Sequence, residues 1–261
     1  MDMTARRLVV AMPKGGSGKT ATSVAFAWGL QRAGRRVLVV DLDSQGNATA
    51  ALGVDAQPGA YGVLQFLLRP ELPFEPQRIS EGLEVVPACP WAAGVDLEVQ
   101  RANQLTGPVA VREALERVED RYDFILCDCA PSLGPVTYNA LAAGPILAPV
   151  ETTRLGVSVL PELGRVVQQL RRGVAPQANV LAYLPTRFVE EQTESREALR
   201  ALEGLAGDRV LRTRIPLATA IARSLAEGVP LYDARYRPSK GPPAYLEAVD
   251  ELLPLLEASH G

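Results

Sequence analysis

Histidine is nearly absent from this chain of 261 residues, and its single copy is the penultimate residue, His260. Catalytic triads use histidine as their base and many catalytic zinc sites use it as a ligand, so the sequence argues against both kinds of site. Three cysteines, an odd number, provide no disulfide framework. No apolar run approaches the roughly 18 residues of a membrane-spanning helix, and residues 1–7 contain no apolar signal core. We therefore expect a cytoplasmic protein without structural disulfides.

Lysine is also scarce, because it supplies only 3 of the 27 basic residues. Two of these lysines, Lys14 and Lys19, lie in the segment Pro13–Thr20, which reads Pro-Lys-Gly-Gly-Ser-Gly-Lys-Thr. A lysine ammonium can enter a tight phosphate-binding loop as a point charge, whereas the planar guanidinium of arginine is bulkier. This placement predicts a nucleotide-phosphate loop with one additional lysine.

The residues around this loop have the pattern of a strand, a glycine loop and a helix. Residues 8–12 form a short apolar run typical of a buried strand, and residues 20–32 place apolar side chains at helical spacing. Glycines leave backbone N–H groups free to bind phosphate oxygens, and the positive end of the helix dipole adds to the attraction. We expect Lys19 to bind the β and γ phosphates and Thr20 to bind Mg²⁺. The predicted nucleotide-binding residues here are Lys14, Gly15, Gly16, Ser17, Gly18, Lys19, Thr20 and Ala21.

Two further strand-like runs end in aspartate. The run over residues 36–43 ends in Asp41 and Asp43, which alternate along the expected strand and therefore share one side of it. The run over residues 122–128 ends in Asp128, as in a Walker B strand, whose carboxylate supports the Mg²⁺ shell. Ligands bind at the carboxyl ends of parallel strands. We therefore expect these carboxylates to lie beside the phosphate loop, where they can hold metal-bound water and orient an attacking water.

These motifs together resemble those of the ParA/MinD family of ATPases, and the resemblance runs from Leu8 to about Leu253. The loop has the family's deviant form, Lys-Gly-Gly-x-Gly-Lys-Thr, and residues 41–49 match its Asp-x-Asp-x-Gln-Gly-Asn-x-Thr box. The resemblance implies that Lys14 reaches into the active site of a partner subunit and that Asp43 is the residue most needed for hydrolysis. The implied catalytic residues are Lys14, Asp43 and Asp128, and the implied Mg²⁺ ligands are Thr20, Asp43 and Asp128.

The chain departs from the family's pattern at several positions. Ala130 replaces a proline that usually follows the third motif. Arg187 and Pro216 lie in segments that line the adenine in relatives, so the resemblance implies a nucleotide contact for each, with Pro216 expected at the end of a strand. The basic residues that usually follow Ile-Pro are replaced by residues 217–220, Leu-Ala-Thr-Ala. The DNA-binding role that those positions have in several relatives is therefore not carried over to them.

The alternation of strand-like and helix-like runs predicts one α/β domain over residues 1–261, a P-loop NTPase fold with no DNA-reading extension before Leu8. Its sheet should be mainly parallel and twisted, flanked by helices on both faces. The proline-rich residues 55–108 are expected to be rich in loops. Further helices are expected over residues 109–120, 155–172, 194–203 and 243–258, and further strands over 124–128, 146–150 and 179–184.

The segment from residue 212 to residue 240 is basic, although the chain as a whole has a net charge of −3. Contacts of arginine and lysine with phosphates give DNA affinity that is independent of sequence and sensitive to salt. A solvated surface with intramolecular ion pairs would have the same composition. The predicted contacts to double-stranded DNA are Arg212, Arg214, Arg223, Arg235, Arg237 and Lys240.

The sequence leaves three functions to compare. The first is a DNA-partition ATPase of the nucleoid, an ATP-bound homodimer on nonspecific DNA that is released when a ParB-like partner stimulates hydrolysis. The second is a MinD-like membrane-surface regulator, attached through a basic amphipathic C-terminal helix. Residues 247–257 are acidic and Pro254 is expected to break their helix, so we expect no membrane contact. The third, a small-molecule kinase or ligase, is weakened by Lys14, whose role makes most sense across a dimer.

The cysteines raise one further alternative, because the iron protein of nitrogenase has a similar phosphate loop. Only Cys89 and Cys129 could converge on a shared iron–sulfur cluster, and neither has the flanking glycines that we would expect. We expect all three cysteines to be small buried apolar residues instead.

Overall fold

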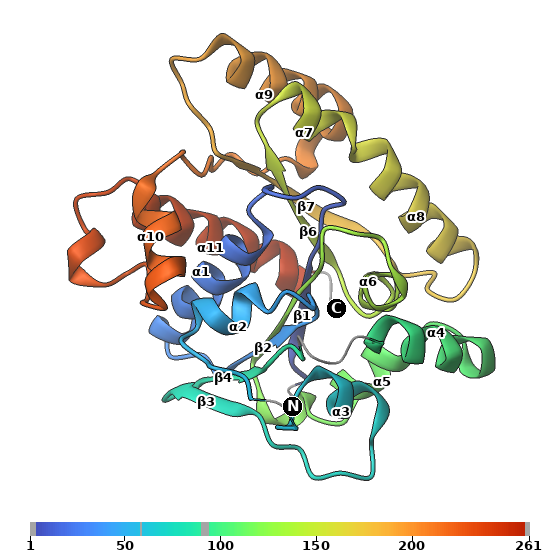
Figure 1. The fold of residues 1–261 in the computed structure, drawn as a ribbon. Helices are drawn as coiled ribbons and strands as arrows, with labels where there is room; N and C mark the ends of the chain where they lie inside the picture. The colour runs from blue at the N-terminus through green and yellow to red at the C-terminus, as the bar shows by residue number, and fades with distance from the viewer. Residues whose placement is uncertain (1–3, 58, 90–93, 259–261) are drawn as a thin grey trace.

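The computed structural model describes residues 4–57, 59–89 and 94–258, and it contains one seven-stranded sheet (Figure 1). The strand order is β3-β4-β2-β5-β1-β6-β7. All neighbouring strands pair in parallel except β3 and β4. The strands are β1 (Arg6–Val10), β2 (Val37–Asp41), β3 (Gln77–Ser80), β4 (Leu83–Val86), β5 (Phe124–Asp128), β6 (Ile146–Glu151) and β7 (Val180–Thr186). The predicted α/β fold with a mainly parallel sheet is confirmed.

Helices cover both faces of the sheet because its central strands are apolar on both sides. Every residue of β2 and β5 is buried. One face packs against α1 (Lys19–Arg32), α2 (Asn47–Ala51), α10 (Thr219–Glu227) and α11 (Gly241–Ala258). The other face packs against α3 (Val63–Leu68), α4 (Val95–Thr106), α5 (Ala110–Glu116), α6 (Pro135–Leu141) and α8 (Leu160–Arg172). The short helix α7 (Arg154–Ser158) and the longer helix α9 (Thr193–Ala206) lie beyond the carboxyl ends of β6 and β7 (Figure 1).

The structure corrects several expected elements. Residues 55–108 contain α3, β3, β4 and α4, so this proline-rich region is more regular than its composition indicates. The helix expected over residues 155–172 is two helices, because Pro161 has no N–H to continue the first one and instead lies in the first turn of α8. Residues 214–216 form no strand, and Pro216 makes only an isolated bridge to Phe188.

The helix expected over residues 243–258 is α11, but the break expected at Pro254 is absent, because α11 continues through this residue to Ala258. Pro254 is exposed, whereas Leu252 and Leu256 on either side of it are buried against the sheet. The packing of this apolar side outweighs the one backbone hydrogen bond that proline removes. None of the described helices is both long and apolar enough to cross a membrane.

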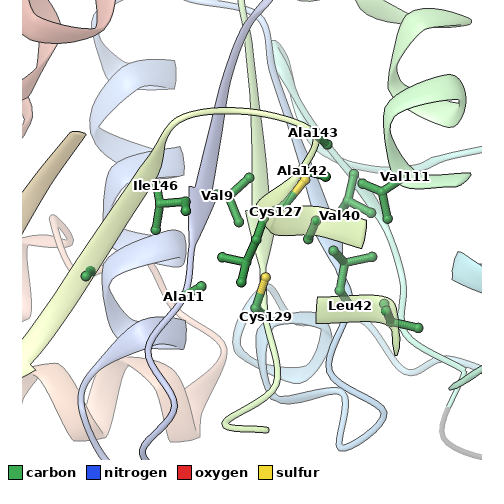
Figure 2. Packing of buried hydrophobic residues seen from close by; sticks show 14 of the residues in the cluster. Val9, Ala11, Val40, Leu42, Val111, Cys127, Cys129, Ala142, Ala143 and Ile146 are labelled. Carbon is green, nitrogen blue, oxygen red and sulfur yellow. The ribbon is translucent and has the colours of Figure 1, made fainter. Parts of the chain in front are cut away.

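The three cysteines are buried and unpaired, as predicted. Cys127 and Cys129 lie among small apolar side chains, including Val9, Val40 and Ile146 (Figure 2). Burial raises the pKa of the Cys127 thiol to about 12 and that of Cys129 well above its ordinary value, so both thiols are protonated at neutral pH. The described residues contain no group of three or more histidine, cysteine, aspartate or glutamate side chains that could hold a metal, and His260 lies outside them.

Candidate active site

The phosphate loop follows β1 and leads directly into α1. Its backbone has positive φ at Gly16 (75°) and Gly18 (92°), a conformation that side chains other than glycine rarely adopt. No side chain caps the start of α1, so its first N–H groups face the loop. Thr186, at the end of β7, donates a 2.8 Å hydrogen bond from Oγ1 to the carbonyl of Ser17. Two strands of the sheet therefore fix the shape of the loop.

Two polar side chains inside the loop fit a bound phosphate. The Nζ atom of Lys19 donates to the carbonyl of Lys14 at 2.8 Å, within the same loop. Burial lowers the pKa of Lys19, while the charge of Asp128 opposes that shift. The Oγ atom of Ser17 is buried without a hydrogen-bond partner. A phosphate group would supply both a negative charge for Lys19 and an acceptor for Ser17.

Asp128 and Thr20 are brought together at the carboxyl end of β5. The Asp128 carboxylate accepts hydrogen bonds from Thr20 Oγ1 at 2.9 Å and from Ser23 Oγ at 2.7 Å. Burial raises the pKa of Asp128, and the nearby charge of Asp41 raises it further, while both hydroxyl donors and Lys19 oppose the rise. A hydroxyl beside a carboxylate is the hard oxygen set that Mg²⁺ prefers. Their role as Mg²⁺ ligands stays a prediction.

The two aspartates at the carboxyl end of β2 have different surroundings, although the sequence predicted a carboxylate pair on one side of a strand. Asp41 is the last residue of β2 and is fully buried; it accepts hydrogen bonds from the backbone N–H and the hydroxyl of Thr49 at 2.8 and 2.7 Å. Burial raises the pKa of Asp41. Asp43 lies beyond the strand, and among the described residues its carboxylate accepts only from the N–H of Gln45, at 3.0 Å. Asp41 therefore holds the turn in place, while Asp43 keeps carboxylate capacity for another partner.

An acidic partner of Lys14 was missed in the sequence. The Glu151 carboxylate, at the end of β6, forms ion pairs with Lys14 and, at 3.0 Å, with Arg187. Gly156 makes this arrangement possible, since a Cβ atom there would lie 2.0 Å from the Glu151 carbonyl oxygen. In the sequence, Glu151 was recognisable only as a polar residue directly after the strand expected over residues 146–150. The additional lysine is thus held beside the loop by its own chain.

The segments predicted to line the adenine lie side by side at the end of β7. The N–H of Phe188 donates to the Ile215 carbonyl at 2.9 Å, and Phe188 bridges to Pro216. The guanidinium of Arg214 lies 5.1 Å from the centre of the Phe188 ring. Arg187 has a φ of 54° and directs its side chain to Glu151. The structure thus brings Arg187 and Pro216 to neighbouring segments, and their contact with adenine stays a prediction.

The predicted DNA-binding residues fall into two groups. Arg223 and Arg235 both form ion pairs with Glu227, at 3.3 and 3.2 Å, and Arg235 also pairs with Asp233 at 3.0 Å. Among the described residues, the other four, Arg212, Arg214, Arg237 and Lys240, form no ion pair. Part of the basic segment is therefore compensated within the chain. The sequence could not show this, because Glu227 and Asp233 compensate charges up to eight residues away.

Comparisons with known proteins agree with this geometry. Residues 5–180 match the family model described as an AAA domain. The chromosome-partitioning ATPase Soj of Thermus thermophilus is 34% identical over 255 residues, with 95% of each chain covered. This chain belongs to the ParA/Soj family of partition ATPases. The sporulation initiation inhibitor protein Soj of Bacillus subtilis is 30% identical over 250 residues. The match covers 94% of this ParA/Soj protein and 97% of the Bacillus protein.

Solved structures show the same fold. McdA from Cyanothece superposes with a TM-score of 0.84 at 23% identity, over 95% of this ParA/Soj chain and 99% of McdA, a likeness that concerns the fold alone. Cobyrinic acid a,c-diamide synthase from Mycobacterium smegmatis, with a bound ATP analogue and magnesium, superposes with a TM-score of 0.82 at 29% identity, over 97% and 96% of the two chains. The predicted family is confirmed, and nucleotide and magnesium are bound in a structure with this fold.

Proposed function

We propose that this protein is a Mg²⁺-dependent DNA-partition ATPase that acts as an ATP-bound homodimer. The observation that carries the proposal is the contrast between its two loop lysines. The Lys19 side chain is buried and turned into the phosphate loop, whereas the side chain of Lys14 pairs with Glu151 at the end of β6. One lysine is placed to bind the nucleotide of its own subunit. The other can leave an exchangeable ion pair and reach a phosphate of a second subunit.

The chemistry assigned to each residue follows from its position. Mg²⁺ would be held by the hydroxyl of Thr20 and the carboxylate of Asp128, and it would neutralise charge on the β and γ phosphates. Asp43 is the carboxylate that would orient an attacking water. Lys14 from the partner subunit would stabilise charge that develops on the γ phosphate. Hydrolysis is expected to be slow until a second protein completes this arrangement.

DNA binding and release form the second half of the proposal. Arg237 and Lys240, which form no ion pair among the described residues, would with Arg212 and Arg214 give each subunit a modest basic surface, and dimerisation would double it. Contacts of this kind would give sequence-independent affinity for the nucleoid in the cytoplasm. A ParB-like protein that stimulates hydrolysis would then release the dimer. The relatives' names support chromosome partition as the setting.

The MinD-like alternative requires an amphipathic C-terminal helix that is free to lie on a membrane. Here the apolar side of α11 packs in the protein core, because Tyr245, Leu252 and Leu256 are buried in the same cluster as Phe26 of α1. The ring of Tyr245 packs edge-on against Phe26 with 6.4 Å between ring centres. A membrane would therefore have to compete with the core for this helix, which favours DNA over a membrane as the surface bound.

Fluorescence anisotropy with a labelled DNA duplex tests the proposal. Binding should require ATP and Mg²⁺, differ little between unrelated sequences, and weaken steeply with salt. If about three phosphates are neutralised by each subunit, a dimer should give a log–log salt slope near −5, from about −0.9 per phosphate. Binding that is equal with and without ATP, or that occurs on anionic vesicles and not on DNA, would contradict it.

A further inference from the structure

A cavity lies where the parallel strands begin, at the opposite end of the strands from the phosphate loop. This cavity has a volume of about 580 Å³ and is bounded by the end of α1, the turn before β2, β3, the start of β4 and the turn before β5. The five-residue strand β2 runs from this end to Asp41, so about 16 Å of strand separates the two ends. The cavity is therefore distinct from the candidate active site.

The charge of the cavity is predominantly positive. Its lining contains four arginines against two glutamates: Arg35, Arg36, Arg78 and Arg121, with Glu81 and Glu84. Arg36 is paired with Asp123 at 3.0 Å. Among the ion pairs of the described residues, none involves Arg35, Arg78 or Arg121. Burial would raise the pKa of Asp123, but Arg36 and Arg35 together lower it, so the charge of Arg35 is partly compensated, whereas Arg78 and Arg121 form no ion pair among the described residues.

The rim and the floor of the cavity are held in place by different contacts. The guanidinium of Arg121 lies 5.2 Å from the centre of the Phe74 ring, which positions it at the rim. On the floor, the hydroxyl of buried Tyr122 donates to the Glu84 carboxylate. Glu84 is thereby occupied with an internal donor. The cavity has a fixed polar floor beneath a rim of arginines.

Ser80 provides a second, independent indication of a ligand. Ser80 belongs to the cavity lining, and its buried Oγ atom has no hydrogen-bond partner within the part of the chain that the structure describes. An unmatched buried hydroxyl costs free energy, and an anionic oxygen in the cavity would satisfy it. Arginine guanidinium groups bind phosphate through paired N–H donors.

We propose that this cavity binds a small ligand with a diphosphate or triphosphate group. The volume lies within the range of small-molecule sites, about 300 to 1,000 Å³. Arg78 and Arg121, which form no ion pair among the described residues, and the partly compensated Arg35 offer more positive charge than one phosphate needs. The two glutamates in the walls disfavour the long, continuous backbone of DNA, so a compact polyphosphate is the better match.

Inorganic tripolyphosphate is a suitable probe, with excess EDTA to remove metal. Because the phosphate loop also binds phosphates, the Lys19→Ala chain is used to weaken that site. Isothermal titration calorimetry should then show one remaining site per chain. In this background, Arg35→Gln with Arg78→Gln should weaken binding at least about tenfold, since several charge-assisted hydrogen bonds are lost.

Matched controls separate this site from general charge effects. Arg171→Gln with Arg172→Gln removes the same charge from the exposed end of α8, outside the cavity, and should leave binding unchanged. Ser80→Ala, a smaller change, should weaken binding about threefold. No remaining site in the Lys19→Ala chain, or equal losses for the cavity and control pairs, would overturn the proposal.

Hydrogen exchange on the unmodified chain saturated with Mg-ADP provides a test that needs no substitution. Tripolyphosphate should protect the segments 34–36 and 78–84, which contain most of the residues that line the cavity. Absence of protection there would also overturn the proposal, as would protection by a short DNA duplex and not by tripolyphosphate. These results are independent of ATP-dependent DNA binding, so either proposal can fail while the other stands.

Discussion

The phosphate loop and the basic segment of residues 212–240 are both rich in positive charge, but their charges are organised differently. In the loop, each cation lies near a carboxylate on a strand distant in sequence: Lys19, which also donates to the Lys14 carbonyl, is near Asp128, and Lys14 pairs with Glu151. In the basic segment, Arg223 and Arg235 are compensated by nearby carboxylates, while Arg237 has no ion pair among the described residues. Motif spacing predicted the loop well, whereas counting charges overstated the free positive charge of the segment.

The largest expected effect separates the two loop lysines. Lys19→Ala removes the cation buried inside the loop and should weaken ATP binding about 100-fold or more, because the phosphates lose a charge-assisted hydrogen-bond donor. Lys14→Ala should change ATP binding by less than about threefold and should abolish dimerisation or hydrolysis. Equilibrium binding of a fluorescent ATP analogue and steady-state turnover measure the two effects. Equal losses of binding in both variants would show that the division of roles is wrong.

The second prediction concerns the two aspartates after β2. Asp43→Ala should lower turnover about 100-fold while ATP binding is retained, so that an ATP-bound dimer accumulates. Size-exclusion chromatography with light scattering, in ATP and Mg²⁺, should show the dimer. Asp41→Asn is the comparison, because Asp41 holds Thr49 and should chiefly affect stability to urea. A monomeric Asp43→Ala chain, or one that turns over at the parental rate, would contradict the assignment.

The third prediction divides the basic segment by its ion pairs. Arg237→Gln with Lys240→Gln should make the salt slope of DNA binding shallower by about 3 to 4 units in a dimer, if each of the four side chains neutralises one phosphate. Arg223→Gln with Arg235→Gln removes the same formal charge, but these side chains are already paired with Glu227 and Asp233. Their loss should change the slope by less than about 1 unit. Equal changes in the two double variants would mean that the intramolecular pairs do not persist on DNA.

These contrasts also indicate how far the sequence could predict the molecule. Glycines, lysines and strand-end aspartates at fixed spacing determine the loop, β2 and β5, because parallel strands must place their carboxyl ends at one edge. The pairing of Glu151 with Lys14 depends on residues 137 apart in sequence, and no local pattern encodes it. Likewise, α11 continues through Pro254 because its other side is buried, which is a property of the tertiary structure.

The smallest expected effect comes from Glu151, which keeps Lys14 within its own subunit. Glu151→Gln removes the carboxylate charge from a pair whose side chains are only 13% and 18% exposed. The free monomer should then hold Lys14 less tightly, so that the same lysine reaches a second subunit at lower cost. Relief of about 1 kcal/mol corresponds to roughly fivefold tighter ATP-dependent dimerisation.

Analytical ultracentrifugation over a range of protein concentrations, with ATP and Mg²⁺, measures this change. Glu162 is an exposed residue of α8. Glu162→Gln removes the same charge at a distance from Lys14 and serves as the control. In the Lys14→Ala chain, the Glu151 substitution should not change dimerisation, since the ammonium group that Glu151 restrains is then absent. If Glu151→Gln instead weakens dimerisation, then Glu151 supports Lys14 in the dimer as well, and the ion pair is part of the assembled site. If Glu151→Gln still strengthens dimerisation in the Lys14→Ala chain, then the effect arises from Arg187, the other cation that pairs with Glu151.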